Sequence, residues 1–99
     1  MPRKRQPREI WNETRRRVLE RDGYRCVGPT CGGVSLTEKT AHIDHIKSGK
    51  NATNKMSNLR TLCRRCHTLR ADMRHRGMIA SALKAGVIPP NWRELVWED

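Results

Sequence analysis

Largely apolar residues recur at intervals of three and four between residues 8 and 22 of this 99-residue chain. Charged side chains occupy most positions between them, and Gly23 follows where a helix C-terminus favours glycine. This pattern predicts an amphipathic helix whose narrow inward stripe is Ile10, Trp11, Thr14, Val18 and Leu19. Residues 1–7 are basic and interrupted by proline, so we expect a disordered arm there.

The middle of the chain lacks helical periodicity. The segment CVGPTCGG, residues 26–33, holds one proline and three glycines, which favours a tight turn or knuckle. Residues 40–46 alternate enough to form a short strand, and residues 59–62 can form a second one. The stretch KSGKNATNKMSN between them is polar and rich in asparagine, which is typical of a loop.

Helical patterns return in the last third of the chain. Residues 64–76 predict a helix that turns Leu69 and Met73 inward, and a smaller helix is expected over residues 78–85. Two consecutive prolines then interrupt the chain before a last short helix. The apolar residues of that helix can pack back on the core: Trp92, Leu95 and Val96.

Composition changes this picture, because it leaves little material for a core. Hydrophobic residues make up 35% of the chain and phenylalanine is absent, whereas roughly 45 to 50% is usual when glycine is counted. Residues 8–99 have about the length of one domain. We therefore expect a single domain that needs a crosslink or a metal ion in addition to apolar burial.

Charge narrows the choice of partners. Twenty-one Lys and Arg against ten Asp and Glu give a net charge of +11 and a pI near 10.6. Such a surplus favours polyanions, and most simply nucleic acid. A membrane surface would also attract it, but the sequence has neither a long apolar run nor an N-terminal signal pattern. We expect a soluble, cytoplasmic protein with no membrane partner.

Four cysteines form two close pairs, one spaced C-x4-C and one C-x2-C. In a cytoplasmic chain such pairs suit tetrahedral zinc better than disulfides, and the ion would join segments that lie far apart in the sequence. His67 could compete through its spacing of four from Cys63. However, four thiolates complete the shell, and neighbouring helical residues point about 100° apart. The expected ligands of a structural Zn²⁺ are Cys26, Cys31, Cys63 and Cys66.

The polar residues around the second cysteine pair carry a family resemblance. DHI at residues 44–46, NL at residues 58–59 and LCRRCH at residues 62–67 resemble the HNH endonuclease family in its zinc-bearing form. The resemblance covers about half of the chain, from Arg21 to Arg70. It implies a small α+β fold with these parts: a ββα-metal (His-Me finger) core over about 40–76, a structural zinc knuckle, flanking helices and a C-terminal helical extension over 78–99.

The resemblance also implies metal-dependent cleavage of DNA, and the residue types suit that chemistry. Phosphodiester hydrolysis needs a base that activates water and positive charge at the phosphate. Histidine titrates near neutral pH, so His45 is the expected general base. Asp44 and His67 offer an oxygen and a nitrogen ligand, a mixed pair that could hold Mg²⁺, Mn²⁺, Ni²⁺ or a second Zn²⁺ with positions open for water and phosphate.

Other polar residues would support this site. By similarity with the family, Asn58 either ligates the ion or hydrogen-bonds across the loop so that His45 is aimed correctly. Because consecutive strand residues point to opposite faces, Asp44 and His45 can serve one site only if the strand ends or bulges there. His42 lies on the Asp44 face, where it either touches phosphate, joins the metal shell or is a structural histidine. The first cysteine pair is longer than the usual C-x2-C and the common proline after the DHI motif is absent, so we expect a different loop shape with the same chemistry.

Arginines crowd the predicted helix over residues 64–76, with hardly any acid between them. We expect them to contact phosphates, which predicts salt-sensitive binding of DNA with weak sequence preference. Arg70 stands where the family commonly carries lysine, and it either contacts the phosphate or is an ordinary surface residue. The expected DNA-binding residues are Arg64, Arg65, Arg70 and Arg74.

Two other functions explain part of the sequence. A non-catalytic zinc module that binds DNA or RNA explains the charge and the cysteines, and a basic ribonucleoprotein component explains the charge alone. Neither accounts for Asp44, His45 and His67 together. Small proteins of this kind resemble those of bacteriophages and their bacterial hosts, with roles from packaging to restriction and homing, so a phage packaging protein or another protein partner is one option. A monomer would cut one strand at a time, and the oligomeric state stays open.

Overall fold

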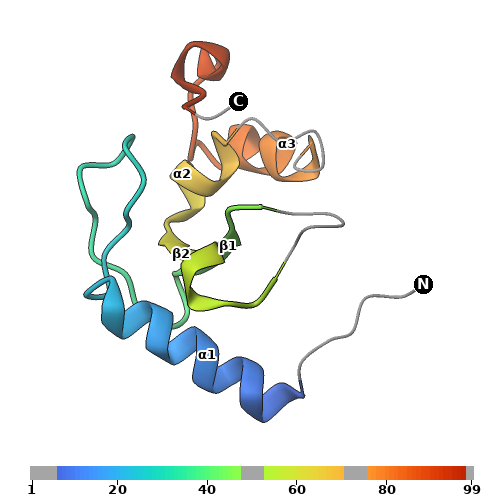
Figure 1. The fold of residues 1–99 in the computed structure, drawn as a ribbon. Coiled ribbons are helices and arrows are strands. Elements are labelled where there is room, and N and C mark those ends of the chain that lie inside the picture. The colour runs from blue at the N-terminus through green and yellow to red at the C-terminus, as the bar shows by residue number, and fades with distance from the viewer. Residues whose placement is uncertain (1–6, 48–52, 71–75, 98–99) are drawn as a thin grey trace.

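The computed structural model describes residues 7–47, 53–70 and 76–97 (Figure 1). The expected disordered arm, apart from Pro7, lies outside the described residues, as do Met73 and Arg74. The described regular elements, in chain order, are α1 Arg8–Arg21, β1 His42–His45, the 3₁₀ helix η2 Met56–Asn58, β2 Leu59–Leu62, α2 Arg64–Thr68, α3 Arg76–Lys84 and the 3₁₀ helix η4 Trp92–Leu95.

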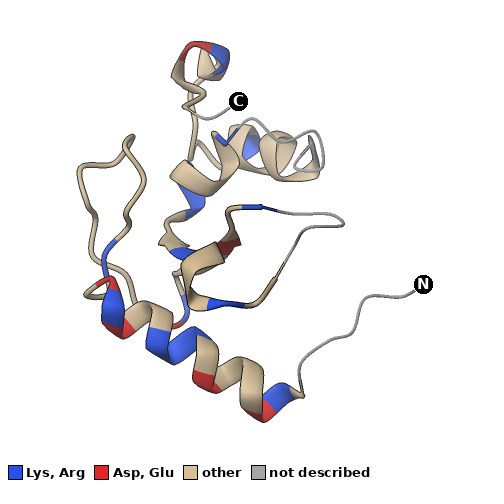
Figure 2. Cartoon of the chain, in the orientation of Figure 1, with Lys and Arg blue, Asp and Glu red and all other residues tan. Residues whose placement is uncertain are grey.

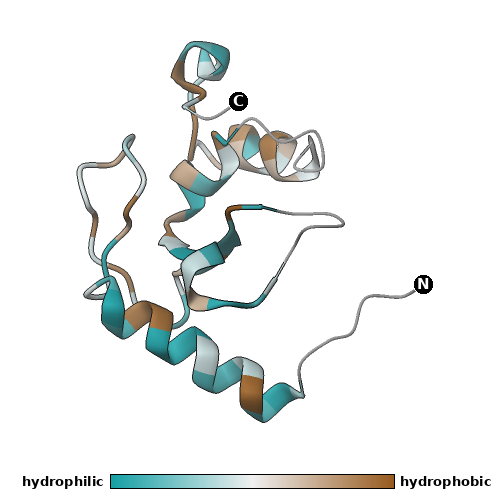
Figure 3. Cartoon of the chain, viewed as in Figure 1, coloured by the Kyte–Doolittle hydropathy of each residue, from teal (hydrophilic) through white to brown (hydrophobic). Residues whose placement is uncertain are grey.

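The first helix has nearly the bounds that its apolar spacing predicts, but Ile10, which was expected to face inward, is 52% exposed. Val18 and Leu19 are its buried residues, while much of the rest of the helix is hydrophilic (Figure 3). The chain leaves α1 through Gly23 and Tyr24, both with a positive φ, of 66° and 55°. Glycine adopts this conformation without a steric penalty, whereas Tyr24 adopts it at some cost. The turn brings the following cysteine segment back toward the strands.

Two short antiparallel strands form the centre of the fold. Their register places His42 opposite Leu62 and Asp44 opposite Arg60. β2 matches the strand predicted over residues 59–62, and β1 is slightly shorter than the predicted segment. Only Cys63 separates β2 from α2, so the two strands and this helix form the expected ββα unit, with α1 on one side and α3 beyond α2 (Figure 1).

The helix α2 is shorter than the sequence predicts. It ends at Thr68 instead of continuing toward residue 76. The Cys66 carbonyl, which would accept from the Arg70 amide if the helix continued, accepts a hydrogen bond from Trp97 Nε1 at 2.8 Å. The Trp97 amide also donates to the Leu69 carbonyl at 3.4 Å. Trp97 thus donates to carbonyls at the end of α2, and Arg70 lies outside the helix.

The core of the described chain includes two small clusters joined by one side chain. The first gathers Leu62 with three buried cysteines, and the second gathers Leu69, Ala82 and Ile88. Trp97 packs against both. Trp92 and Leu95 pack on the second cluster, as the sequence predicts, although their short helix is of the 3₁₀ type. No helix among the described residues has the length and apolarity to cross a membrane.

Truncation of the buried Leu62 side chain tests how much of the fold depends on the first cluster. Because Leu62 is fully buried, Leu62→Ala is expected to lower the free energy of unfolding by roughly 2 to 5 kcal/mol. Urea unfolding followed by circular dichroism measures the change. Val34→Ala, at a side chain that is 43% exposed, is the matched control, with an expected change below about 0.5 kcal/mol. Equal changes for the two variants would contradict the assignment of the core.

Candidate metal centres and catalytic site

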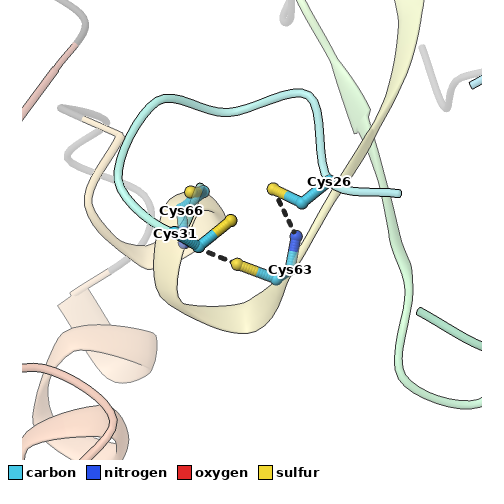
Figure 4. A group of neighbouring side chains, drawn as sticks. All are labelled: Cys26, Cys31, Cys63 and Cys66. Carbon is cyan, nitrogen blue, oxygen red and sulfur yellow. Dashed lines mark hydrogen bonds between the residues drawn. The ribbon is translucent and has the colours of Figure 1, made fainter. Parts of the chain in front are cut away.

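Four cysteines from two distant segments meet at one point (Figure 4). The Sγ atoms of Cys26, Cys31, Cys63 and Cys66 all lie within 4.8 Å of one another. A tetrahedral ion with Zn–S distances of about 2.3 Å has sulfur atoms about 3.8 Å apart. The described chain therefore fits the four-thiolate coordination typical of zinc, as the two cysteine spacings predict. His67 is not part of this group.

Backbone N–H groups point at the sulfur atoms and favour their anionic form. Cys26 Sγ accepts from the amides of Gly28 and Cys63 at 3.3 and 3.2 Å, and Cys63 Sγ accepts from the Cys66 amide at 3.3 Å. Two of these contacts are drawn in Figure 4. Thr30 Oγ1 lies 2.8 Å from Cys66 Sγ. Such charge-assisted contacts stabilise thiolates that coordinate a cation.

The acidity of the thiols shows why a cation completes this cluster. Burial raises the pKa values of Cys26 and Cys63. Burial also acts to raise the pKa of Cys31, but hydrogen bonds, foremost from the Val34 amide, outweigh it and lower that pKa to about 7. Four adjacent thiols cannot all ionise at neutral pH without a compensating charge, which a divalent ion supplies.

A second group of polar residues gathers around His67, apart from the thiolates. Asp44 is 3% exposed, and its Oδ1 lies 3.4 Å from His67 Nε2. His67 Nδ1 in turn lies 2.8 Å from His42 Nδ1, and the two rings meet edge to face. His42 therefore contacts the ring nitrogen that faces away from Asp44, in the manner of a residue that orients a metal ligand. His42 therefore lies on the same face of β1 as Asp44, as the strand alternation predicts.

Two arginines also hold the Asp44 carboxylate. Arg60 Nε donates to Oδ2 and Arg70 Nη1 donates to Oδ1, both at 2.7 Å. Burial acts to raise the pKa of Asp44, but the hydrogen bond from His67 and the contacts with Arg60 and Arg70 outweigh it and lower that pKa to about 2. The carboxylate is therefore ionised at neutral pH. The sequence analysis did not single out Arg60, although the strand register, once known, places it directly opposite Asp44.

His45, the last residue of β1, faces the other way. Its Nε2 lies 2.8 Å from Asn54 Oδ1, and its ring lies parallel to that of Trp11, with centroids 6.0 Å apart and an interplanar angle of 5°. The sequence analysis placed Trp11 on the inward stripe of the first helix but assigned it no part in the site, because it lies far upstream. It did not single out Asn54, which resembles an ordinary loop residue. β1 ends at His45, which is one of the two conditions under which Asp44 and His45 could serve one site.

Asn58 braces the loop that follows β1. Its Oδ1 accepts from the Lys47 amide at 2.8 Å, and its Nδ2 donates to the carbonyls of Lys47 and Thr53 at 3.1 and 2.9 Å. The side chain is buried and its amide oxygen is used by the backbone. The family resemblance allows Asn58 either to bind the ion or to hydrogen-bond across the loop. The geometry corresponds to the second role, and these hydrogen bonds hold the backbone that follows His45.

The arginines predicted to bind DNA differ in their surroundings. Arg64 is exposed and donates to Ser81 Oγ at 2.9 Å, while Arg65 donates to the Val87 carbonyl at 3.3 Å. Arg70 is buried, and besides Asp44 it donates to the carbonyls of His45 and Ile46. Arg70 is thus neither an ordinary surface residue nor an open phosphate contact. Figure 2 shows further Lys and Arg along α1 and around α2.

Comparison with known families identifies the central region. The family model described as HNH endonuclease matches residues 26–72. These residues therefore match an HNH endonuclease domain, and the resemblance inferred from the sequence motifs is confirmed over them. The match includes both cysteine pairs, Asp44, His45 and His67, and it leaves out α1 and the C-terminal extension. No curated protein and no solved structure matches the chain. An HNH domain indicates a nuclease or nucleic-acid-binding function.

Substitution of Gly28 tests the thiolate cluster. A Cβ at this position would lie 2.6 Å from Cys66 Cβ and 2.7 Å from its Sγ, so Gly28→Ala is expected to displace one ligand and lower the zinc content well below one ion per chain. Elemental analysis of the purified protein measures the ratio. Gly77→Ala is the matched control, because a Cβ there meets nothing within 4 Å. Full zinc occupancy in Gly28→Ala would contradict the geometry of the cluster.

The pKa of Asp44 predicts how its contribution to stability changes with pH. The pKa falls from 3.8 to about 2 on folding, so the contribution, about 2 kcal/mol, is present above pH 3.8 and is lost as the pH falls toward 2. Asp44→Asn is expected to be destabilised at pH 7 by roughly 2 to 4 kcal/mol, because an amide faces two arginine cations. The difference from the unmodified chain should narrow in acid, as measured by urea unfolding. Glu20→Gln, at an exposed ion pair, should change stability by less than about 0.5 kcal/mol.

Proposed function

We propose that this protein is a metal-dependent DNA endonuclease that hydrolyses phosphodiester bonds with weak sequence preference. His45 is the general base, and Asp44 and His67 hold one divalent ion. The observation that carries the proposal is the place of His67, whose Nε2 lies 3.4 Å from Asp44 Oδ1 while the four thiolates form a separate cluster. A carboxylate oxygen and an imidazole nitrogen on one side of α2 are a suitable donor pair for such an ion.

The donor set fits a catalytic ion better than a structural one. Two protein ligands leave most coordination positions open for water and for phosphate oxygens, as a hydrolytic site requires. When bound, the ion would supply positive charge to the scissile phosphate and lower the pKa of coordinated water. His42 orients the His67 ring, and Asn58 holds the backbone that follows His45.

The protonation of His45 follows from its partner. Asn54 Oδ1 is a carbonyl oxygen and can only accept, so the hydrogen in this contact is on His45 Nε2. The other ring nitrogen, Nδ1, then carries the lone pair that would take a proton from the attacking water. Attack on phosphorus with release of the 3′ oxygen would leave a 5′ phosphate and a 3′ hydroxyl, the ends that the family produces.

One observation favours the alternative of a non-catalytic zinc module that binds nucleic acid. Both oxygens of Asp44 already accept hydrogen bonds from arginines, so the carboxylate is compensated without any ion. In that case the basic surface would bind DNA, with Arg64 as an exposed phosphate contact and with no cleavage.

Plasmid cleavage separates these functions. Zinc-loaded protein is incubated with supercoiled plasmid and Mg²⁺, Mn²⁺ or Ni²⁺, with and without EDTA. Metal-dependent nicked or linear DNA is expected from the unmodified chain, and a rate at least about 100-fold lower from His45→Ala, because the general base is lost. Asp44→Asn and His67→Ala should also cleave more slowly, and added metal should not increase their rate, because the ligands of the ion are lost.

The control for cleavage is Val34→Ala, which should match the unmodified chain. Binding is measured on the same DNA by fluorescence anisotropy at several salt concentrations, and His45→Ala should bind as the unmodified chain does. Supercoiled DNA that survives in every lane, at equal binding, would exclude the endonuclease and leave the zinc module.

A further inference from the structure

The helix α1 lies outside the region that matches the HNH model, but it reaches His45. Trp11, in its second turn, places its indole parallel to the His45 imidazole, with ring centroids 6.0 Å apart and planes within 5°. The matched region begins at residue 26. The ring that covers the proposed general base therefore comes from a part of the chain that the family model does not describe.

Two contacts fix the orientation of the His45 ring. One face lies against Trp11, and Nε2 donates to Asn54 Oδ1 at 2.8 Å. A stacked ring can turn about the Cβ–Cγ bond only by losing the stacking. The hydrogen bond alone defines one point of the ring, whereas the hydrogen bond and the stacking together define its plane.

The helix that carries Trp11 is itself anchored to both strands of the site. Arg15, one turn after Trp11, donates to the Ala41 carbonyl at 3.0 Å, directly before β1. Arg21 donates to the Met56 and Leu59 carbonyls at 2.7 and 2.6 Å, at the start of β2. These contacts, at two places about one and a half turns apart, hold α1 in a fixed position against the strands. The indole is therefore attached to the same framework as the imidazole.

Trp11 does not serve as an ordinary core residue. It belongs to neither of the two buried clusters, and its side chain is only partly buried. The ring contact found for Trp11 among the described residues is with His45.

We propose that Trp11 is a positioning residue for His45: it holds the imidazole in the plane in which Nε2 binds Asn54 and Nδ1 is presented to the attacking water. The inference rests on the proposed function, because it concerns the general base of that reaction. It assigns to α1 a direct part in the site, in addition to its contribution to the fold.

The experiment compares Trp11→Ala, Trp11→Phe and the control Ile10→Ala in the zinc-loaded full chain. Ile10 is adjacent to Trp11 and 52% exposed. Single-turnover cleavage under saturating DNA measures the chemical step, and anisotropy measures binding. Long-range ¹H–¹⁵N NMR spectra of the histidine rings report the tautomer of His45, whose signals are assigned by their absence in His45→Ala.

Trp11→Ala is expected to slow single-turnover cleavage roughly 10- to 100-fold, the cost of a misaligned reacting group, with DNA affinity within about twofold. Its His45 signals should shift from a single Nε2–H tautomer toward a mixture. Trp11→Phe retains a stacking ring and should remain within about fivefold of the unmodified rate, and Ile10→Ala should not differ from the unmodified chain.

An unchanged rate together with an unchanged His45 tautomer in Trp11→Ala would overturn the proposal. So would a lower rate explained entirely by lost DNA binding. If Trp11→Ala does not fold, Trp11→Leu replaces it and the same two readouts decide. If the unmodified chain cleaves no DNA, the proposed function fails, whereas the NMR spectra still report whether Trp11 fixes the ring.

Discussion

The thiolate cluster is the constraint on which the rest of this small structure depends. It joins the segment after α1 to the junction between β2 and α2, and these segments are more than thirty residues apart in the sequence. Cys63 lies between β2 and α2, and its sulfur accepts from the Cys66 amide at the first turn of that helix. The cluster thereby sets the direction of α2 relative to the strands. With so few buried apolar side chains, the described chain relies on this crosslink between distant segments.

The direction of α2 decides the geometry of the second site. Cys66 and His67 are consecutive, so one helical step of about 100° separates a residue that faces sulfur from a residue that faces Asp44. Trp97 connects the two sides: its indole donates to the Cys66 carbonyl, and Arg60, which holds Asp44, lies over its ring at 4.8 Å. A displacement of Cys66 would therefore reach Asp44 through a short chain of contacts, by way of Trp97 and Arg60.

The features that were predictable from the sequence are those set by local pattern and close spacing. Apolar periodicity gave α1, alternation gave the face shared by His42 and Asp44, and helical geometry separated His67 from the thiolates. The end of α2 was not predictable, because it depends on Trp97 taking the Cys66 carbonyl from thirty-one residues away. The inward turn of Arg70 and the stacking of Trp11 on His45 likewise depend on long-range packing. Residue spacing within a motif carries no information about these contacts.

The pairing of Asp44 with Arg60 and Arg70 has a consequence for the stability of the chain in the absence of an added metal ion. A bare buried carboxylate would repel the surrounding carbonyl dipoles and make the fold depend on a captive ion. Here two guanidinium groups balance the charge of the carboxylate, so the fold does not need an ion at this position. Any cation that binds this carboxylate must share it with an arginine, so it would bind reversibly and would not be needed to maintain the fold.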